Sequence, residues 1–231
     1  MNDGGAGAGG GDGASPHGPE AATRIVAIRH GETDWNAGAR IQGHTDIALN
    51  AVGRWQAQRV AQALADEDFA AVYASDLARA ADTAAALAQR HGLPLQRHAA
   101  LRERAFGVFE GLGFDEIERR WPEQALAWRR REPDFGPEGG ETLRDFYTRC
   151  VGAVVALAAR HPGGQIAVVA HGGVLDCLYR AATRIELQAP RTWQVVNAGI
   201  NRLLATPQGL TLVGWADTAH LDGATADDSR G

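Results

Sequence analysis

The 231-residue sequence contains no lysine, so all 23 of its basic residues are arginine. A GC-rich coding bias explains this most simply, since it also accounts for the many alanines and glycines. Arginine usage as a whole therefore carries no functional argument, because an isolated surface arginine contributes little. Each arginine must be argued from its own position.

Several other features are scarce. Only two cysteines occur, Cys150 and Cys177, and neither belongs to a Cys-x-x-Cys pair, which indicates structural thiols in a cytoplasmic protein. No apolar run approaches the roughly 20 residues that span a bilayer, and no secretory signal is visible, so we expect no membrane partner. A net charge of −5 argues against a nucleic-acid partner. The histidines lack metal-site spacing such as His-x-His, and we expect neither a metal site nor a cofactor.

The composition divides the chain into one domain and two tails. Residues 1–22 and 223–231 contain too little apolar surface to offset the entropy of ordering, so both are expected to be disordered. Residues 23–222 show no linker and no repeat, and we expect them to form a single domain.

Segments typical of strands and of helices alternate along this domain. Apolar runs rich in β-branched residues predict strands, and helical spacing predicts helices capped at Asn50 and at Ser75-Asp76. The expected strands are 24–29, 70–74, 166–170, 192–197, 200–206 and 210–215. The expected helices are 50–66, 141–160, 173–183 and an alanine-rich helix that starts at Ser75-Asp76 and stops at Gly92.

This alternation predicts an α/β fold, a three-layer α/β/α sandwich around a mainly parallel sheet. One segment, 103–140, is too long for an ordinary connection and carries short expected helices near 115–120 and 122–131. We expect this insertion to cover the functional site.

Two of the expected strands end in the same dipeptide. Residues 25–29 lead into His30-Gly31, and residues 166–170 lead into His171-Gly172. Ligands of such sheets bind beyond the carboxyl ends of the strands, so the two histidines should lie at one edge. Arg29 adds a fixed positive fork there, which predicts a site for an anionic group, most simply a phosphate.

A neutral imidazole in such a site can attack phosphorus and store the phosphoryl group as phosphohistidine. It must be held in one tautomer, which requires a bond from one ring nitrogen to backbone or carboxylate. His30, directly after a buried strand, is the candidate nucleophile.

Six motifs in order along 24–222 resemble the histidine phosphatase superfamily, also called the phosphoglycerate mutase-like superfamily. They are RHGETDWN at 29–36, IQGHTDIALN at 41–50, SDLARAADTA at 75–84, LRERAFGVFEG at 101–111, GGET at 139–142 and VAHGG at 169–173. The resemblance implies a phosphoglycerate mutase-like fold.

The resemblance also implies roles for individual residues. His30 would be the phosphorylated nucleophile, Glu103 the general acid and base, and His171 a third catalytic residue. Phosphate or substrate contacts would come from Arg29, Asn36, Gln42, Gly43, Arg79 and Gly172. His44 and His220 receive no role.

The superfamily contains both phosphatases and bisphosphoglycerate-dependent phosphoglycerate mutases. Trp128-Arg129-Arg130 resembles the paired arginines of the mutases, but Ala105-Phe106, Phe114 and Gly173 replace residues that mutases usually carry. The aromatic character of Phe106, Phe109 and Phe114 suits a less charged leaving group. We therefore expect a phosphomonoesterase acting on a small phosphorylated metabolite, with a mutase as the alternative.

A third reading is a non-catalytic phosphate-binding module. Such relatives normally lose the nucleophilic histidine or the acid, whereas this chain retains both. The sequence leaves a homodimer open.

Overall fold

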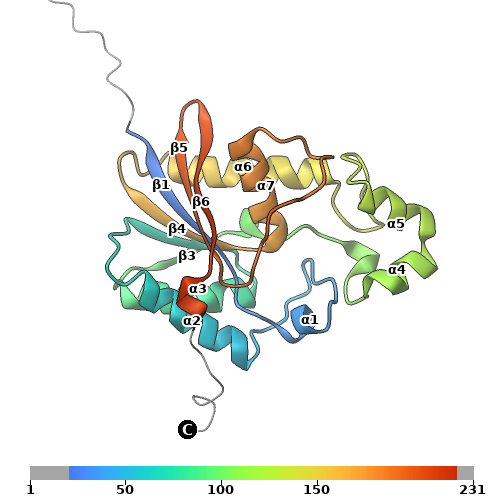
Figure 1. Cartoon of the computed structure of the whole chain (residues 1–231), viewed down its shortest axis with the longest axis horizontal. Helices are drawn as coiled ribbons and strands as arrows, with labels where there is room; N and C mark the ends of the chain where they lie inside the picture. Colours follow the sequence, from blue (N-terminus) through green and yellow to red (C-terminus); the bar gives the residue numbers. More distant parts are fainter. Residues whose placement is uncertain (1–20, 223–231) are drawn as a thin grey trace, which may run out of the picture.

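A six-stranded sheet forms the centre of the computed structural model, which describes residues 21–222 (Figure 1). Its strands, in the order β3-β2-β4-β1-β5-β6, are β1 (Thr23–Arg29), β2 (Ala71–Ala74), β3 (Leu95–Arg97), β4 (Gln165–Ala170), β5 (Ile200–Thr206) and β6 (Gly209–Asp217). Strands β3, β2, β4 and β1 are parallel to one another, and β5 is antiparallel to both β1 and β6. The predicted mainly parallel sheet is confirmed, while the two predicted tails fall mostly on residues outside the described range.

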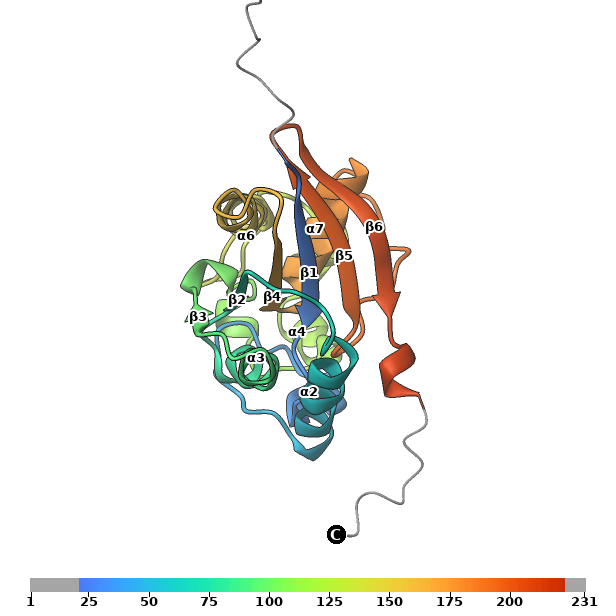
Figure 2. The ribbon, with the colours of Figure 1, turned by 90° about the vertical axis from the view of Figure 1, so that its left-hand side faces the viewer.

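Helices cover both faces of the sheet, as the predicted three-layer fold requires (Figure 2). Because side chains alternate along a strand, Val26 and Ile28 of β1 face α2 (Ala51–Ala63) and α3 (Ala78–Arg90). Ile25 and Ala27 face α6 (Leu143–Ala158) and α7 (Gly172–Thr183). Within residues 21–222, no helix has the length and apolar composition needed to cross a membrane.

The predicted insertion forms a unit beyond one end of the sheet (Figure 1). It carries η2 (Gly107–Phe109), α4 (Phe114–Arg120) and α5 (Pro122–Arg129). Phe109, Ile117 and Ala125 form its own small buried core, against which Trp121 and Trp128 pack. The remaining short elements are α1 (Asp34–Ala37), η1 (Ala99–Leu101) and η3 (Ala219–Leu221).

Of the two predicted helix N-caps, one is confirmed and the other is wrong. Asn50 caps α2, since its side chain accepts a hydrogen bond from the Gly53 N–H at 2.8 Å. Ser75-Asp76 does not cap α3, which begins at Ala78. The Ala78 N–H instead donates to Asp46 Oδ1 at 2.8 Å, a partner 32 residues away. Asp76 instead forms a bidentate salt bridge with Arg102.

The predicted strand at 192–197 is also wrong, because this segment forms a loop. Its carbonyl groups bind side chains instead of a neighbouring strand. Val195 O accepts from Arg29 Nη1 at 2.6 Å, and Gln194 O accepts from Trp215 Nε1 at 2.8 Å. The apolar residues of this segment are partly buried, as their pattern predicts, but its backbone carbonyls bond to side chains instead of to a neighbouring strand.

Candidate active site

The parallel pairing of β1 and β4 brings the two predicted histidines together. The His30 N–H donates to the Ala170 carbonyl at 2.9 Å, which extends the ladder by one residue. The ring centroids of His30 and His171 lie 5.1 Å apart, and both side chains are buried. The two histidines therefore lie beside each other at the carboxyl edge of the sheet, as predicted.

The surroundings give these imidazoles opposite tautomers. Nδ1 of His30 lies 2.6 Å from the Gly31 carbonyl, which can only accept, so Nδ1 carries the proton and Nε2 keeps its lone pair. Nδ1 of His171 accepts from Arg79 Nε at 3.3 Å, so neutral His171 carries its proton on Nε2. That Nε2 has no partner within residues 21–222. The site thus offers one nucleophilic nitrogen and one hydrogen-bond donor.

Both imidazoles are neutral at physiological pH. Burial, reinforced by the charges of Arg29 and Arg79, holds the pKa of His30 well below the usual 6.5. Burial, followed by Arg79 and His30, has the same effect on the pKa of His171. A neutral His30 retains the lone pair that a nucleophile requires.

Buried Arg79 and partly buried Arg29 supply the positive charge. Arg79 is fully buried, and its guanidinium donates to the Thr45 and Gly43 carbonyls at 2.9 and 2.8 Å. Burial lowers the pKa of Arg29 to about 10, with Arg191 and Arg79 adding to the shift and Glu103 opposing it. Arg29 therefore stays charged at neutral pH, and its Nε has no partner in the described part of the chain.

The 42–45 loop is held in place by a carboxylate. Glu110 accepts from the backbone N–H groups of His44 and Thr45, both at 2.9 Å. Gly43 has a φ of 52°, and a Cβ there would lie 2.1 Å from Glu110 Oε1, so glycine is required. Buried Gln42 leaves its Oε1 without a partner among the described residues. The loop therefore presents Gly43 and Gln42 in a fixed conformation.

Asn36 is linked to His30 through the side chain of Asn197. Its Oδ1 accepts from the Thr33 N–H at 3.1 Å and from Asn197 Nδ2 at 3.2 Å, so its own Nδ2 is the end left to donate. Asn197 also donates to the His30 carbonyl at 2.9 Å. Asn197, in the loop that the sequence predicts as a strand, thus connects the His30 carbonyl to Asn36 Oδ1.

Glu103 reaches the site from the insertion. Its Oε1 accepts from the Arg104 N–H and its Oε2 from the Gly173 N–H, both at 2.9 Å. Gly172 and Gly173 begin α7, where N–H groups lack helical partners and favour negative charge. His44 Nε2 donates to the Glu103 carbonyl at 2.8 Å, so His44 positions this segment.

These groups surround a cavity of about 390 Å³, named here the His30 cavity. All predicted site residues except His171 line it, and His171 lies directly beside His30. Phe106 and Trp128 of the insertion also line it, so the insertion covers the site as predicted. Phe109 is in the insertion core and Phe114 packs on Trp128, so neither lines this cavity. Of the three phenylalanines expected to suit a less charged leaving group, only Phe106 lines it.

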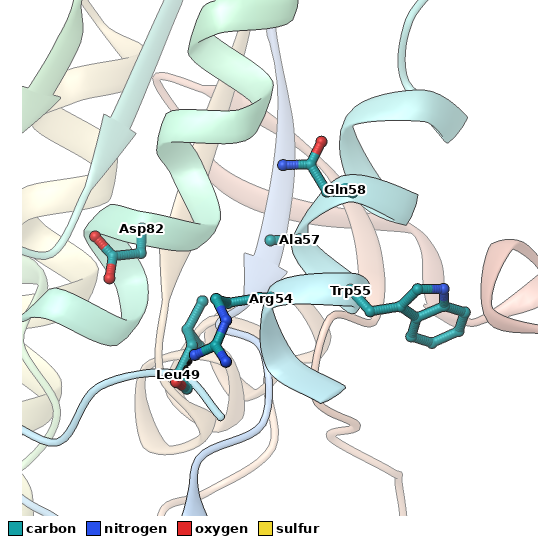
Figure 3. A pocket seen from close by; sticks show the side chains of 6 residues that line it. All are labelled: Leu49, Arg54, Trp55, Ala57, Gln58 and Asp82. Atoms are coloured by element: carbon teal, nitrogen blue, oxygen red, sulfur yellow. Dashed lines mark hydrogen bonds between the residues drawn. The ribbon is translucent and has the colours of Figure 1, made fainter. Parts of the chain in front are cut away.

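A separate hollow of about 410 Å³ lies between α2 and α3 (Figure 3). It is lined by Leu49, Arg54, Trp55, Ala57, Gln58 and Asp82, none of which was predicted to act. The described residues contain no group of three or more His, Cys, Asp or Glu side chains that could hold a metal ion.

The sequence did not predict several residues of the site, among them Thr83, Glu110, Arg191 and Asn197. Thr83 Oγ1 accepts from the Gly31 N–H at 2.9 Å, and Arg191 lines the His30 cavity. Each reaches the site over a long sequence separation. Thr83 and Glu110 do fall within quoted motifs, which was the one available signal.

The sequence matches a known family over almost the whole described range. Residues 25–218 match the histidine phosphatase superfamily, branch 1. The chain belongs to this superfamily. The predicted family and phosphoglycerate mutase-like fold are confirmed.

The similar proteins carry both phosphoglycerate mutase-like and phosphatase names. The chain is 40% identical over 202 residues to phosphoglycerate mutase-like protein 4 of Arabidopsis thaliana, covering 86% of each protein. It is 38% identical to the metal-independent phosphoserine phosphatase of the same plant, covering 86% of this chain and 83% of that protein. A solved mycobacterial glucosyl-3-phosphoglycerate phosphatase in complex with VO3 superposes with a TM-score of 0.75 at 33% identity, covering 84% of this chain and 99% of that one. The predicted class, an enzyme of the histidine phosphatase type, is confirmed.

Proposed function

We propose that the protein hydrolyses a small phosphomonoester through transient phosphorylation of His30 at Nε2. The observation that carries this proposal is the 2.6 Å contact between His30 Nδ1 and the Gly31 carbonyl. It fixes the tautomer and leaves the Nε2 lone pair available for attack on phosphorus. A non-catalytic phosphate-binding module would have no use for this arrangement.

The first step forms the bond between Nε2 and phosphorus as the ester P–O bond breaks. Charge then accumulates on the equatorial phosphoryl oxygens. Arg29, Arg79 and the unpartnered Nε2–H of His171 are fixed beforehand and stabilise that charge. The Gly172 N–H, at the start of α7, adds the positive end of a helix.

Glu103 is the proton donor to the departing ester oxygen. In the second step it accepts a proton from water, whose oxygen attacks phosphorus and breaks the bond to Nε2. Inorganic phosphate leaves, and His30 regains its lone pair. Glu103 suits both steps because it lines the same cavity as His30 and is oriented by two N–H groups.

A mutase is the second candidate, supported by the relative named phosphoglycerate mutase-like protein 4. A mutase must hold a second anionic end of its substrate tightly, and Arg129-Arg130 were the expected clamp. Arg129 is paired with Glu118, and Arg130 does not line the His30 cavity. Hydrolysis is therefore the reaction the geometry supports better.

Release of phosphate from p-nitrophenyl phosphate with EDTA present tests the proposal. We expect turnover, together with an acid-labile, base-stable phosphoryl label on His30 after rapid quenching. His30→Ala should lose both, while His98→Ala, outside the cavity, serves as the control. Turnover by His30→Ala, or a label on another residue, contradicts the mechanism. Faster interconversion of 2- and 3-phosphoglycerate with a bisphosphoglycerate primer than hydrolysis of any monoester establishes the mutase instead.

A further inference from the structure

A second cavity of about 520 Å³ adjoins the His30 cavity. The two share Glu103, Phe106, Trp128 and Arg191 in their walls. If Glu103 protonates the leaving oxygen, as proposed above, the alcohol part of the substrate extends from that oxygen into this adjoining cavity. The walls of the adjoining cavity therefore select the alcohol.

Four arginines line the adjoining cavity, and three of them already have partners. Arg104 donates to the Glu141 and Phe135 carbonyls. Arg131 donates to Asp176 at 2.6 Å and to the Leu187 carbonyl at 2.7 Å. Arg129 is paired with Glu118 and stacks over Phe114.

Arg191 differs from the other three. Within residues 21–222 it makes no side-chain hydrogen bond and no ion pair, and it is exposed at the boundary between the two cavities. Its charge is close enough to Arg29 to contribute to lowering that pKa. It lies in the loop that joins α7 to β5, which is a different segment of the chain from the insertion. Among the described residues, the Arg191 guanidinium at this boundary is therefore free to pair with a negative group of a ligand.

We propose that Arg191 binds a carboxylate carried by the alcohol part of the substrate. This inference rests on the proposed function and assigns a specificity-determining residue to it. A guanidinium presents two parallel donors that match a carboxylate. One guanidinium balances the single charge of a carboxylate, whereas the dianionic phosphoryl group is bound by Arg29 and Arg79 together. Phe106 and Trp128 flank the connecting carbon atoms.

Two ligands that differ in one group test the inference. 3-Phosphoglycerate carries a carboxylate where glycerol 3-phosphate carries a hydroxymethyl group. Each is measured as a competitive inhibitor of p-nitrophenyl phosphate hydrolysis, so the test does not require either compound to be a good substrate. We expect 3-phosphoglycerate to bind about 10- to 100-fold more tightly, as one hydrogen bond to a charged group predicts.

The contrast should depend on Arg191 alone. Arg191→Gln should bring the ratio of the two inhibition constants close to one, Arg191→Lys should retain part of it, and Arg130→Gln should retain all of it. A ratio that Arg191→Gln leaves unchanged, or a wild-type ratio near one, overturns the inference.

Calorimetry on His30→Ala, with and without Arg191→Gln, measures the same ratio without turnover. If the ratio depends on Arg191 but the wild-type enzyme hydrolyses no phosphomonoester, the proposed function alone is contradicted. If p-nitrophenyl phosphate is hydrolysed normally but the two ligands bind equally tightly, the inference alone is contradicted.

Discussion

The backbone N–H of Gly173 donates to Oε2 of Glu103 at 2.9 Å, across 70 residues of sequence. A Cβ on residue 173 would lie 2.2 Å from Glu103 Oε1. In the sequence, Gly173 stands where the mutases usually carry another residue. In the structure, glycine at this position leaves room for the Glu103 carboxylate, which faces the leaving oxygen in the proposed mechanism.

Gly173→Ala should therefore displace Glu103 and slow the hydrolysis of alkyl phosphates by at least about 10-fold, within the range that general acid catalysis contributes. Gly152→Ala is the matched control, because a Cβ at Gly152 of α6 meets nothing within 4 Å. Steady-state kinetics with glycerol 3-phosphate check this expectation. Wild-type rates for Gly173→Ala would show that the carboxylate does not need its observed position.

Glu103→Gln tests the proton transfer itself. An alkoxide needs a proton to leave, whereas nitrophenolate does not, so the variant should lose about 10²- to 10⁴-fold on alkyl phosphates and much less on p-nitrophenyl phosphate. The exposed Glu138→Gln is the control. Equal losses on the two substrates would assign Glu103 an electrostatic rather than a proton-transfer role.

Thr83 should be a positioning residue. Its hydroxyl accepts from the Gly31 N–H at 2.9 Å and donates to the Arg79 carbonyl at 2.7 Å, so it joins the His30 turn to α3. Thr83→Val leaves the Gly31 N–H unsatisfied and should lower the free energy of unfolding by about 1–3 kcal/mol.

Denaturant unfolding of Thr83→Val measures that loss, and the control is Thr148→Val. Thr148 makes the same bond to the carbonyl four residues back on an exposed helix face. Because Gly31 also accepts from His30 Nδ1, phosphohistidine formation should slow in Thr83→Val and not in Thr148→Val. A stability loss with unchanged phosphorylation would limit Thr83 to a structural role.

Acid should destabilise the protein through its two buried histidines. The folded pKa values of His30 and His171 lie well below the 6.5 of an unfolded chain. Below pH 6.5 the unfolded state therefore binds protons that the folded state does not, so stability is lost as the pH falls. Each histidine contributes a slope of up to about 1.4 kcal/mol per pH unit.

Denaturant unfolding between pH 6.5 and pH 5 measures this slope. His30→Ala should reduce it by the contribution of one histidine, whatever the variant does to stability at neutral pH. An unchanged slope in His30→Ala would mean that His30 accepts a proton in the folded state.

The sequence by itself determined the features that depend on short spacing. The alternation of apolar strand segments with helical segments predicted the mainly parallel sheet. His30 and His171 each follow one of its strands, and they were predicted to lie together because parallel strands end at the same edge of the sheet. The motifs likewise located Arg29, Arg79 and Glu103, all of which line the His30 cavity.

Only the tertiary structure decided which partner each group meets across long separations. The α3 start is capped by Asp46, and the 192–197 segment binds side chains instead of pairing as a strand. Local sequence offers several partners of similar free energy for such groups, and burial selects among them once the layers have packed. The position of Arg191 between the two cavities depends on the same packing, since no local pattern relates its loop to the insertion.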